Sequence, residues 1–346
     1  MRNSASNAPA EIQASLEPED PMDSDSEYFA SYGDPGVHRL MIADHARTDA
    51  YRRAIEAVVE PGMRVLDVGT GTGILALFAA RAGAEVWAVD ESSILGVARE
   101  LAEANGLASR VHFLRVRVES VKLPHKVDLL VSEWMGFFAL AECMFRSVYV
   151  ARDRHLGPDG RMMPSDVQLF LAPIEDSQLH VERGVGLWQR PVYGLDFSPL
   201  MEHELHNLIT SAVDLPQSSL LSPGEMLLEL DCHTSSTADF FFESEVGFTI
   251  ERPGTLHGFG GWFDVGLGAD VRLATSPFVP QTHWRQSFFP IRPFAVYEGD
   301  EVRVGLRATP KEHGDRRLPI YFMDLWIERE GDEVHRAFYS HEGSFE

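Results

Sequence analysis

Two glutamates on either side of a chain reversal are the residues of this sequence best suited to chemistry. Glu133 follows a strand-like run, and Gly136 permits a reversal that can bring Glu142 back toward it. Two carboxylates flanking one pocket suit acid–base catalysis, metal binding, or the clamping of a planar guanidinium, whose rigid donor fork matches carboxylates. No histidine or aspartate stands nearby at metal-ligand spacing, so we expect no metal site. The alternative is that either glutamate is an ordinary surface residue.

A glycine-rich turn between a strand and a helix is the second candidate. It contains Asp67, Gly69, Gly71 and Gly73, and Asp90 closes the next strand. The G-x-G-x-G spacing departs from the G-x-G-x-x-G of dinucleotide sites, and no P-loop motif is present. Asp67 can face an ammonium group but would repel a pyrophosphate, and Asp90 can accept hydrogen bonds from ribose hydroxyls. The combination predicts S-adenosylmethionine as the ligand, the alternative being a tight turn without a ligand.

An alternation of strands and helices must position these residues. Between residues 64 and 154 the apolar pattern switches repeatedly between the two, which indicates a doubly wound parallel sheet. Ligands bind at the carboxyl ends of such strands, which is where Glu133 stands. The expected strands are 64–68, 85–90, 111–116 and 127–132, and the expected helices are 37–58, 73–82, 94–105 and 139–154.

The pattern changes after Pro164, and strand-like runs then dominate. They lie at 167–173, 225–231, 240–250, 256–265, 284–289, 301–307 and 318–328, and they predict a mainly antiparallel barrel or sandwich. An aromatic helical stretch at about 177–210 is either a packing arm for a partner or an internal helix. The expected domains are a disordered acidic tail (1–25), N-terminal helices with the cofactor domain (26–164) and a β domain (165–346).

Composition limits the partners. The 346-residue chain has a formal net charge of −23, which argues against nucleic-acid binding and favours a cationic partner, although solubility alone also explains it. No apolar run approaches the ~20 residues of a membrane-spanning helix, and we expect no signal peptide. Two cysteines, Cys143 and Cys232, are too few for a disulfide framework. We therefore expect a cytoplasmic protein, or a nuclear one in a eukaryote.

Motifs from both halves of the chain together resemble those of protein arginine N-methyltransferases, from about Tyr28 to the final strands. The matching segments are the double-glutamate loop 132–136 with Glu142, the glycine-rich motif 67–73, Val118-Glu119 on the adenine side, Thr282-His283-Trp284 in the barrel, and the N-terminal helix with Tyr28–Tyr32, His38, Met41, Asp44 and Arg47. Stretches such as 41–44, 47–52 and 256–259 look closest to a nuclear type I branch that methylates histone H3.

The resemblance implies a fold and a set of roles. The fold is a Rossmann-like S-adenosylmethionine-dependent methyltransferase domain followed by a mainly antiparallel β-barrel domain with a helical dimerisation arm. Glu133 and Glu142 would hold the substrate guanidinium, and His283 with Asp44 would relay a proton, unless that histidine is purely structural. The implied cofactor site comprises His38, Met41, Arg47, Asp67, Gly69, Gly71, Asp90, Val118 and Glu119, and the implied substrate pocket comprises Tyr32, Met135, Met144 and Trp284.

Within this implied site, Arg47 would bind the cofactor carboxylate, Asp90 the ribose and Glu119 the adenine amino group. The threonine–histidine–tryptophan loop and two methionines, Met41 and Met144, resemble type I enzymes. These form monomethylarginine and then asymmetric dimethylarginine. The implied substrates are arginine-rich basic proteins, with histones as candidates. Phe137 stands where many relatives have tyrosine, which leaves the product ratio open.

The segment around Trp188 and Tyr193 resembles the arm through which the family forms ring-like homodimers. Two alternatives to the arginine methyltransferase remain. A methyltransferase on the same cofactor domain could act on a small guanidino compound or another non-protein acceptor, but the paired glutamates and the His283 loop argue against it. The chain could also be a catalytically inactive S-adenosylmethionine-binding module, which the retained Glu133 and Glu142 disfavour.

Overall fold

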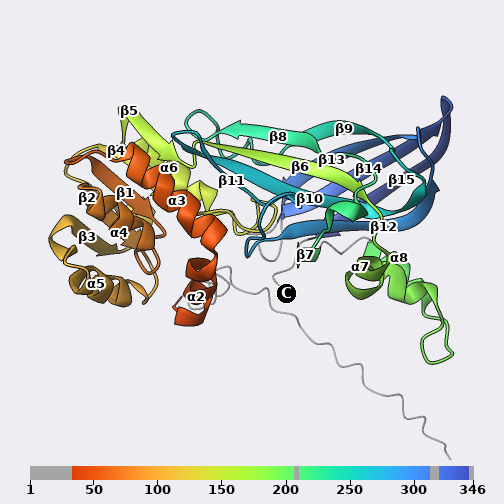
Figure 1. The fold of residues 1–346 in the computed structure, drawn as a ribbon, viewed down its shortest axis with the longest axis horizontal. Helices are drawn as coiled ribbons and strands as arrows, with labels where there is room; N and C mark the ends of the chain where they lie inside the picture. Colours follow the sequence, from red (N-terminus) through yellow and green to blue (C-terminus); the bar gives the residue numbers. More distant parts are fainter. Residues whose placement is uncertain (1–32, 206–209, 312–318, 343–346) are drawn as a thin grey trace, which may run out of the picture.

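The computed structural model of the protein describes residues 33–205, 210–311 and 319–342. The expected tail at 1–25 and the expected pocket residue Tyr32 lie outside this range. Figure 1 shows an elongated molecule with a parallel α/β domain at one end, a long antiparallel β domain in the middle, and a short helical excursion at the other end. Within the described part, no helix combines the length and apolar character needed to cross a membrane.

Two helices precede the parallel sheet, where the sequence predicted one continuous helix over 37–58. Helix α2 (Pro35–Ala43) and helix α3 (His45–Val58) are separated by Asp44, whose backbone is extended at φ −71° and ψ 90°. Its side chain accepts a hydrogen bond from the backbone N–H of Arg47 at 3.0 Å and so caps the start of α3. The break separates α2, whose His38 lies against the glycine-rich turn, from α3, which carries Arg47 in its first turn.

The five-stranded sheet has the order β3-β2-β1-β4-β5 with all neighbours parallel, which confirms the expected doubly wound class. Its strands are β1 (Arg64–Val68), β2 (Glu85–Asp90), β3 (Val111–Arg115), β4 (Val127–Ser132) and β5 (Leu156–Met163), and its helices are α4 (Ile74–Arg81), α5 (Leu95–Ala104), α6 (Phe145–His155), η1 (Ala108–Arg110) and η2 (Val118–Ser120). The strand order reverses between β1 and β4, where Val68 pairs with Ser132. The glycine-rich turn and Glu133 therefore leave the sheet side by side, at the switch point where such sheets bind ligands.

Helix α6 begins at Phe145 rather than at the expected Ala139. Four residues ahead of it have left-handed backbone, with φ of 49° at Phe138, 58° at Ala139, 76° at Glu142 and 51° at Cys143. These dihedrals are incompatible with a right-handed helix, so the segment forms an irregular loop. The prediction was wrong here because no glycine or proline marks the loop between residues 137 and 144.

The β domain consists of two antiparallel sheets that together form the barrel-like unit expected after Pro164. One has the order β7-β12-β10-β6-β8 with β11 beside β10, and the other has the order β15-β14-β13-β9. Their strands are β6 (Asp166–Ile174), β7 (Thr210–Val213), β8 (Glu225–Asp231), β9 (Glu243–Thr249), β10 (Gly254–Gly268), β11 (Val271–Ala274), β12 (Gln286–Val296), β13 (Glu301–Pro310), β14 (Pro319–Arg329) and β15 (Asp332–Glu342), with η4 (Gln217–Ser219) between β7 and β8. Alternating residues of β13 and β14 face the apolar core, as the period of two requires.

A helical excursion interrupts the β domain between β6 and β7. It contains α7 (Ser177–Arg183), η3 (Val185–Gln189) and α8 (Ser198–Leu205) and is described up to Leu205. Trp188 stacks on Phe197 and donates its indole N–H to Glu204 at 2.6 Å, which closes the excursion on itself. A tight turn bridged between Val192 and Leu195 forms its tip. The excursion lies at the end of the β domain remote from the parallel sheet (Figure 1).

Candidate active site

The glycine-rich turn has no side chains at three of its positions, Gly69, Gly71 and Gly73. Gly69 and Gly71 have φ of 71° and 55°, a region that favours glycine. A Cβ added at Gly69 would lie 2.5 Å from Cε of Met144, and one added at Gly71 would lie 2.8 Å from Cε1 of His38. His38, predicted in the cofactor site, and Met144, predicted in the substrate pocket, therefore both lie directly over the turn. A ligand there contacts bare backbone, which fits the amino-acid portion of S-adenosylmethionine.

Asp67 is a buried carboxyl just before this turn. Its Oδ2 accepts hydrogen bonds from the Thr70 hydroxyl at 2.5 Å and from the Ala76 N–H at 3.1 Å. Its Oδ1 is buried without a hydrogen-bond partner among the described residues. Burial raises the pKa of Asp67 to about 7, against the lowering effect of the Thr70 and Ala76 hydrogen bonds. A buried carboxylate oxygen without a partner fits a ligand that brings an ammonium group.

The raised pKa of Asp67 predicts that cofactor affinity depends on pH. At a pH below its pKa of about 7 the Asp67 carboxyl is mostly protonated, and it must lose that proton to attract an ammonium group. The affinity for S-adenosylhomocysteine, measured by calorimetry between pH 5.5 and 7.5, should therefore rise with pH by up to about tenfold per unit below the pKa. Asp67→Asn should bind weakly with a flat profile, whereas Asp159→Asn, which changes an exposed carboxyl, should keep the wild-type slope. A wild-type affinity independent of pH would contradict this role of Asp67.

Two further carboxylates lie beside the cofactor turn. Asp90 at the end of β2 accepts hydrogen bonds from the Gly71 N–H at 2.8 Å and from the N–H and hydroxyl of Ser92 at 2.8 and 2.5 Å. Glu119 lies in η2 next to buried Val118 and accepts a hydrogen bond from the Ser147 hydroxyl at 2.7 Å. Both carboxylates are thus held in one orientation, as a site for ribose and adenine requires.

Arg47 and Glu133 form a buried ion pair that joins the predicted cofactor and substrate sites. Nε and Nη2 of Arg47 donate to Oε2 of Glu133 at 2.9 and 2.7 Å, and the two side chains are only 6% and 8% exposed. Nη1 of Arg47 donates to the carbonyl of Met41 at 3.3 Å. Oε1 of Glu133 accepts a hydrogen bond from the Met135 N–H at 3.2 Å. The first glutamate is therefore fixed by the helix that borders the cofactor turn.

The loop that carries both glutamates reverses at Gly136, as the sequence predicted. Gly136 forms a bridge with Ala139, and the N–H of Ala141 donates to the carbonyl of Phe137 at 3.2 Å. Glu142 follows half-buried, with the left-handed backbone described above. Left-handed backbone at non-glycine residues costs about 1–3 kcal/mol each and persists only where the surroundings enforce it. Such strain at a ligand-binding edge suggests that the loop conformation serves the site.

The β domain contributes a loop to the same site. His283 donates its backbone N–H to Oδ2 of Asp44 at 2.8 Å, and its Nδ1 lies 2.8 Å from the same oxygen. Burial tends to raise the pKa of Asp44, but hydrogen bonds from His283 and from the Arg47 N–H outweigh it and hold the pKa below its usual value. Trp284 donates its indole N–H to the carbonyl of Met135 at 2.7 Å. The barrel loop thus holds both the break between α2 and α3 and the glutamate loop.

Hydrogen bonds join several of the predicted site residues across the fold, namely Arg47 to Glu133, Asp44 to His283 and Gly71 to Asp90. Tyr32 lies outside the described range. Met135 and Trp284, expected in the substrate pocket, are both 4% exposed and support the loop from within the core. Ser92 and Ser147, which orient carboxylates of the cofactor site, were missed. A serine two residues after Asp90 was a readable turn signal, whereas Ser147 has no local signal. In the ranges described, no cluster of three or more histidine, cysteine or acidic side chains is arranged for a metal ion.

The fold and the site define a class. A parallel α/β domain with a G-x-G-x-G turn, a buried aspartate before the turn and a carboxylate at the end of the next strand is that of an S-adenosylmethionine-dependent methyltransferase. In agreement with this class, residues 65–160 match the family model of a methyltransferase domain. Residues 165–324 match the arginine methyltransferase oligomerization subdomain.

Full-length relatives narrow this class to a family. Protein arginine N-methyltransferase 1 of Schizosaccharomyces pombe is 39% identical over 303 residues, which are 85% of this chain and 87% of that protein. Protein arginine N-methyltransferase 6 of Xenopus tropicalis is 35% identical over 312 residues, covering 86% and 90% of the two chains. A solved enzyme–prozyme heterotetramer of Trypanosoma brucei PRMT1 with AdoHcy superposes with a TM-score of 0.84 at 31% identity, covering 90% of this chain and 99% of that one. Arabidopsis thaliana protein arginine methyltransferase 10, in an open conformation, gives a TM-score of 0.81 at 32% identity, covering 91% and 99%.

The chain therefore belongs to the protein arginine methyltransferase family, and it is an S-adenosylmethionine-dependent protein arginine N-methyltransferase. The matched oligomerization subdomain and the heterotetrameric neighbour further indicate that the chain forms oligomers.

Proposed function

We propose that this enzyme methylates arginine side chains of basic, arginine-rich proteins, with histones as candidates, and forms asymmetric dimethylarginine by way of monomethylarginine. The observation that carries the proposal is the reversing loop at the end of β4, which carries Glu133 and Glu142 on either side of Gly136 and follows the strand that pairs with β1, the strand before the cofactor turn. The relatives named protein arginine N-methyltransferase 6 and the net charge of −23 support a type I enzyme with cationic substrates. Placement in the cytoplasm, or in the nucleus of a eukaryote, belongs to the same proposal.

Each residue around the turn has a proposed part in binding the cofactor. A guanidinium has five N–H donors, and Arg47 uses three of them on Glu133 and on the Met41 carbonyl. The remaining donors bind the carboxylate of S-adenosylmethionine. Asp67 attracts the ammonium group, Asp90 the ribose hydroxyls and Glu119 the adenine amino group. When bound, S-adenosylmethionine supplies an electrophilic methyl group.

The two glutamates act on the substrate. An arginine side chain is a poor nucleophile because its lone pairs are delocalised and it stays protonated, with a pKa above ~12. Glu133 and Glu142 hold the guanidinium by its donor fork and keep one nitrogen directed at the methyl group, so positioning supplies a large part of the rate. Their negative charge also favours the cationic substrate once charge has left the sulfonium.

The methylated nitrogen must lose one proton. We assign its removal to His283, whose Nδ1 is engaged by Asp44, which leaves Nε2 as the ring nitrogen that can accept the proton. The side chain of His283 is 18% exposed, so the proton can continue to solvent. Asp44 also caps α3, and the pair has a structural function in addition to this proposed one.

Radiolabelled methyl transfer to peptides tests the substrate. We expect labelling of arginine-rich peptides and none of the same peptides with lysine at every arginine position. Mass spectrometry of the hydrolysed product should show monomethylarginine first and asymmetric dimethylarginine later. Symmetric dimethylarginine, or labelling of small guanidino compounds alone, would contradict the proposal.

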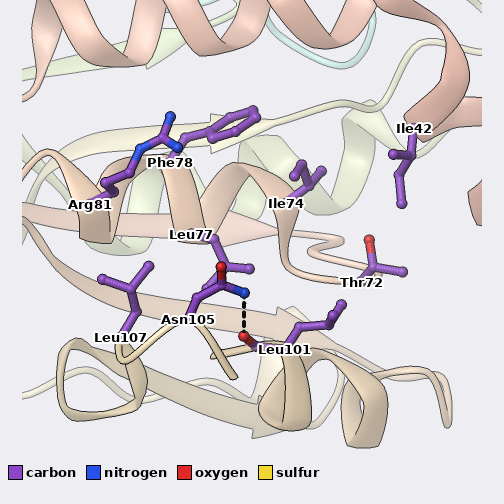
Figure 2. A pocket seen from close by; sticks show the side chains of 9 residues that line it. All are labelled: Ile42, Thr72, Ile74, Leu77, Phe78, Arg81, Leu101, Asn105 and Leu107. Carbon is purple, nitrogen blue, oxygen red and sulfur yellow. Dashed lines mark hydrogen bonds between the residues drawn. The ribbon is translucent and has the colours of Figure 1, made fainter. Parts of the chain in front are cut away.

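The helical excursion supports a homodimer as the form of the oligomer. Its surface carries exposed apolar side chains, with Leu187 45%, Tyr193 fully and Leu195 63% exposed. The cofactor domain has a hollow of about 340 Å³. Figure 2 shows the side chains that line it, among them Leu77 of α4 and Leu101 of α5. Helices α4 and α5, which border the hollow, and the excursion lie at opposite ends of the molecule (Figure 1). We therefore propose that the excursion of one copy covers the hollow of a second copy. Two such contacts close a symmetric ring.

Changing the tip of the excursion should dissociate this dimer. The double variant Tyr193→Lys, Leu195→Lys places two positive charges against a mainly apolar hollow that also contains Arg81, and we expect the dissociation constant to rise by about 30-fold or more, as for loss of an interface hot spot. Light scattering at micromolar concentration measures the shift. Met226→Lys is the matched control, because it adds a charge of the same sign at another exposed apolar residue, 45% exposed on β8. A wild-type chain that is monomeric at these concentrations would overturn the assembly.

A further inference from the structure

Phe138 joins the glutamate loop to the core of the other domain. It lies between Glu133 and Glu142 in sequence, yet its ring is only 3% exposed. The ring makes edge contacts with Phe289 of β12 at a centroid distance of 5.3 Å and with Tyr321 of β14 at 5.8 Å. These two rings pack on each other at 5.4 Å. The catalytic loop of the cofactor domain therefore inserts one aromatic side chain between the two sheets of the β domain.

A glycine makes room for this ring. Gly261 lies in the middle of β10, paired with Leu171 of β6 on one side and Ser287 of β12 on the other. A Cβ added at Gly261 would lie 2.7 Å from Cε2 and 3.1 Å from Cδ2 of Phe138, and 3.1 Å from Cε2 of Phe289. Contacts this short force atoms apart. Strand β10 is paired on both sides of Gly261, with β6 and with β12, so the backbone there cannot shift easily and the ring of Phe138 would have to move.

The backbone of Phe138 shows why the ring matters for the loop. Phe138 and Ala139 adopt successive left-handed conformations with φ of 49° and 58°, which glycine or asparagine would adopt with less strain. Strained backbone of this kind persists only where its surroundings fix it. The buried aromatic contacts of Phe138 are such surroundings. Without them the reversal between Gly136 and Glu142 loses a buried side-chain anchor in the β domain.

We propose that Phe138 is a positioning residue, and that the socket formed by Gly261, Phe289 and Tyr321 sets the position of Glu142 relative to Glu133. The inference rests on the proposed function, because it assigns the socket an effect on guanidinium positioning. Glu133 is held independently by Arg47 in the cofactor domain. A displaced Phe138 ring therefore moves one glutamate and leaves the other in place. The rate of methyl transfer should change while cofactor binding does not.

Filling the socket tests the proposal. In Gly261→Ala the added methyl displaces the ring, and we expect kcat on an arginine peptide to fall by about 10- to 100-fold, as misplacement of about 1 Å does. The affinity for S-adenosylhomocysteine should stay within about twofold, because the turn and Arg47 do not contact the socket. Gly247→Ala in β9 is the matched control, since its Cβ would come no nearer than 4.0 Å to another residue, at Cγ of Arg303. It should retain wild-type kcat.

A double variant that reduces the side chain at 138 while enlarging the one at 261 distinguishes loss of loop positioning from general destabilisation of the barrel. Phe138→Leu shortens the side chain, and combined with Gly261→Ala it should recover at least about half of the lost rate on a logarithmic scale, because neighbouring side chains couple. Circular dichroism and thermal melting establish that each variant is folded. A Gly261→Ala enzyme with wild-type kcat, or a double variant whose losses simply add, would overturn the inference. Failure of the wild-type enzyme itself to methylate arginine peptides would instead reject the proposed function.

Discussion

Replacing Glu142 with glutamine is expected to lower kcat by about 100- to 1000-fold, the range found when one preorganised electrostatic group is lost from an active site. Glutamine keeps the size and hydrogen-bonding reach of the side chain but removes its charge. A neutral amide still touches the guanidinium, but it neither orients the donor fork with two acceptor oxygens nor stabilises the cation that remains after transfer. Because Glu142 belongs to the loop rather than to the cofactor turn, binding of S-adenosylhomocysteine should stay within about threefold of wild type.

The comparison needs two measurements on the same preparations. Calorimetry with S-adenosylhomocysteine reports on the cofactor site, and single-turnover transfer to an arginine peptide reports on chemistry without product release. Glu298→Gln, which alters an exposed glutamate in the turn between β12 and β13, controls for the loss of one negative charge. It should behave as wild type in both assays. A Glu142→Gln enzyme that keeps more than about a tenth of the wild-type rate would exclude the proposed role, since electrostatic groups of this kind contribute more.

The parallel sheet could be predicted because its signals are local. An apolar run followed by closely spaced glycines predicts strand β1 and the turn at Gly69 to Gly73. The switch point follows from the strand order, which the alternation of elements already limits. Strand β5 escaped prediction because Gly157, Pro158 and Gly160 give it the composition of a turn.

The start of α6 could not be predicted for a different physical reason. Residues 139–154 have an acceptable helical pattern, and the left-handed backbone before Phe145 is imposed by contacts distant in sequence. Phe138 is anchored by Phe289 and Tyr321, and Met135 by the indole of Trp284. Nothing within ten residues of the loop encodes these partners. Four of the ten non-glycine residues with positive φ in the described part of the chain thus lie beside the glutamates, as expected where function overrides local preference.

The carboxylates of the site could be predicted from the sequence, but the ion pair between Glu133 and Arg47 could not. Asp67, Asp90, Glu133 and Glu142 stand after strands or in the loop, where ligand-binding residues are expected. The contact between Arg47 of α3 and Glu133 depends on the tertiary structure, because the two residues are 86 positions apart in the chain. The break at Asp44 is what sets the direction of Arg47, and an aspartate three residues before it was a readable capping signal.

Replacing Arg47 with alanine is expected to destabilise the protein by about 3–5 kcal/mol, because removal of one partner leaves the other charge buried without compensation. Glu133 is only 8% exposed, and Oε2 would lose both of its donors. Urea unfolding followed by circular dichroism measures the change. Arg52→Ala on the same helix is the control: its side chain is 38% exposed and pairs with Asp49 and Glu56. An exposed pair of this kind contributes about 1 kcal/mol or less.

A second variant distinguishes burial of an unpaired charge from loss of packing. In Arg47→Met, Glu133→Met both charges are replaced by apolar side chains of comparable length, and unfolding stability should return to within about 1–2 kcal/mol of wild type, since such replacements are often neutral. Activity should not return, because the double variant lacks the donor for the cofactor carboxylate and one glutamate for the substrate. If Arg47→Ala unfolds like Arg52→Ala, the pair carries no buried charge of consequence. Glu133 would then have to be held for the substrate by the Met135 N–H alone, and the coupling between the cofactor helix and the glutamate loop would be absent.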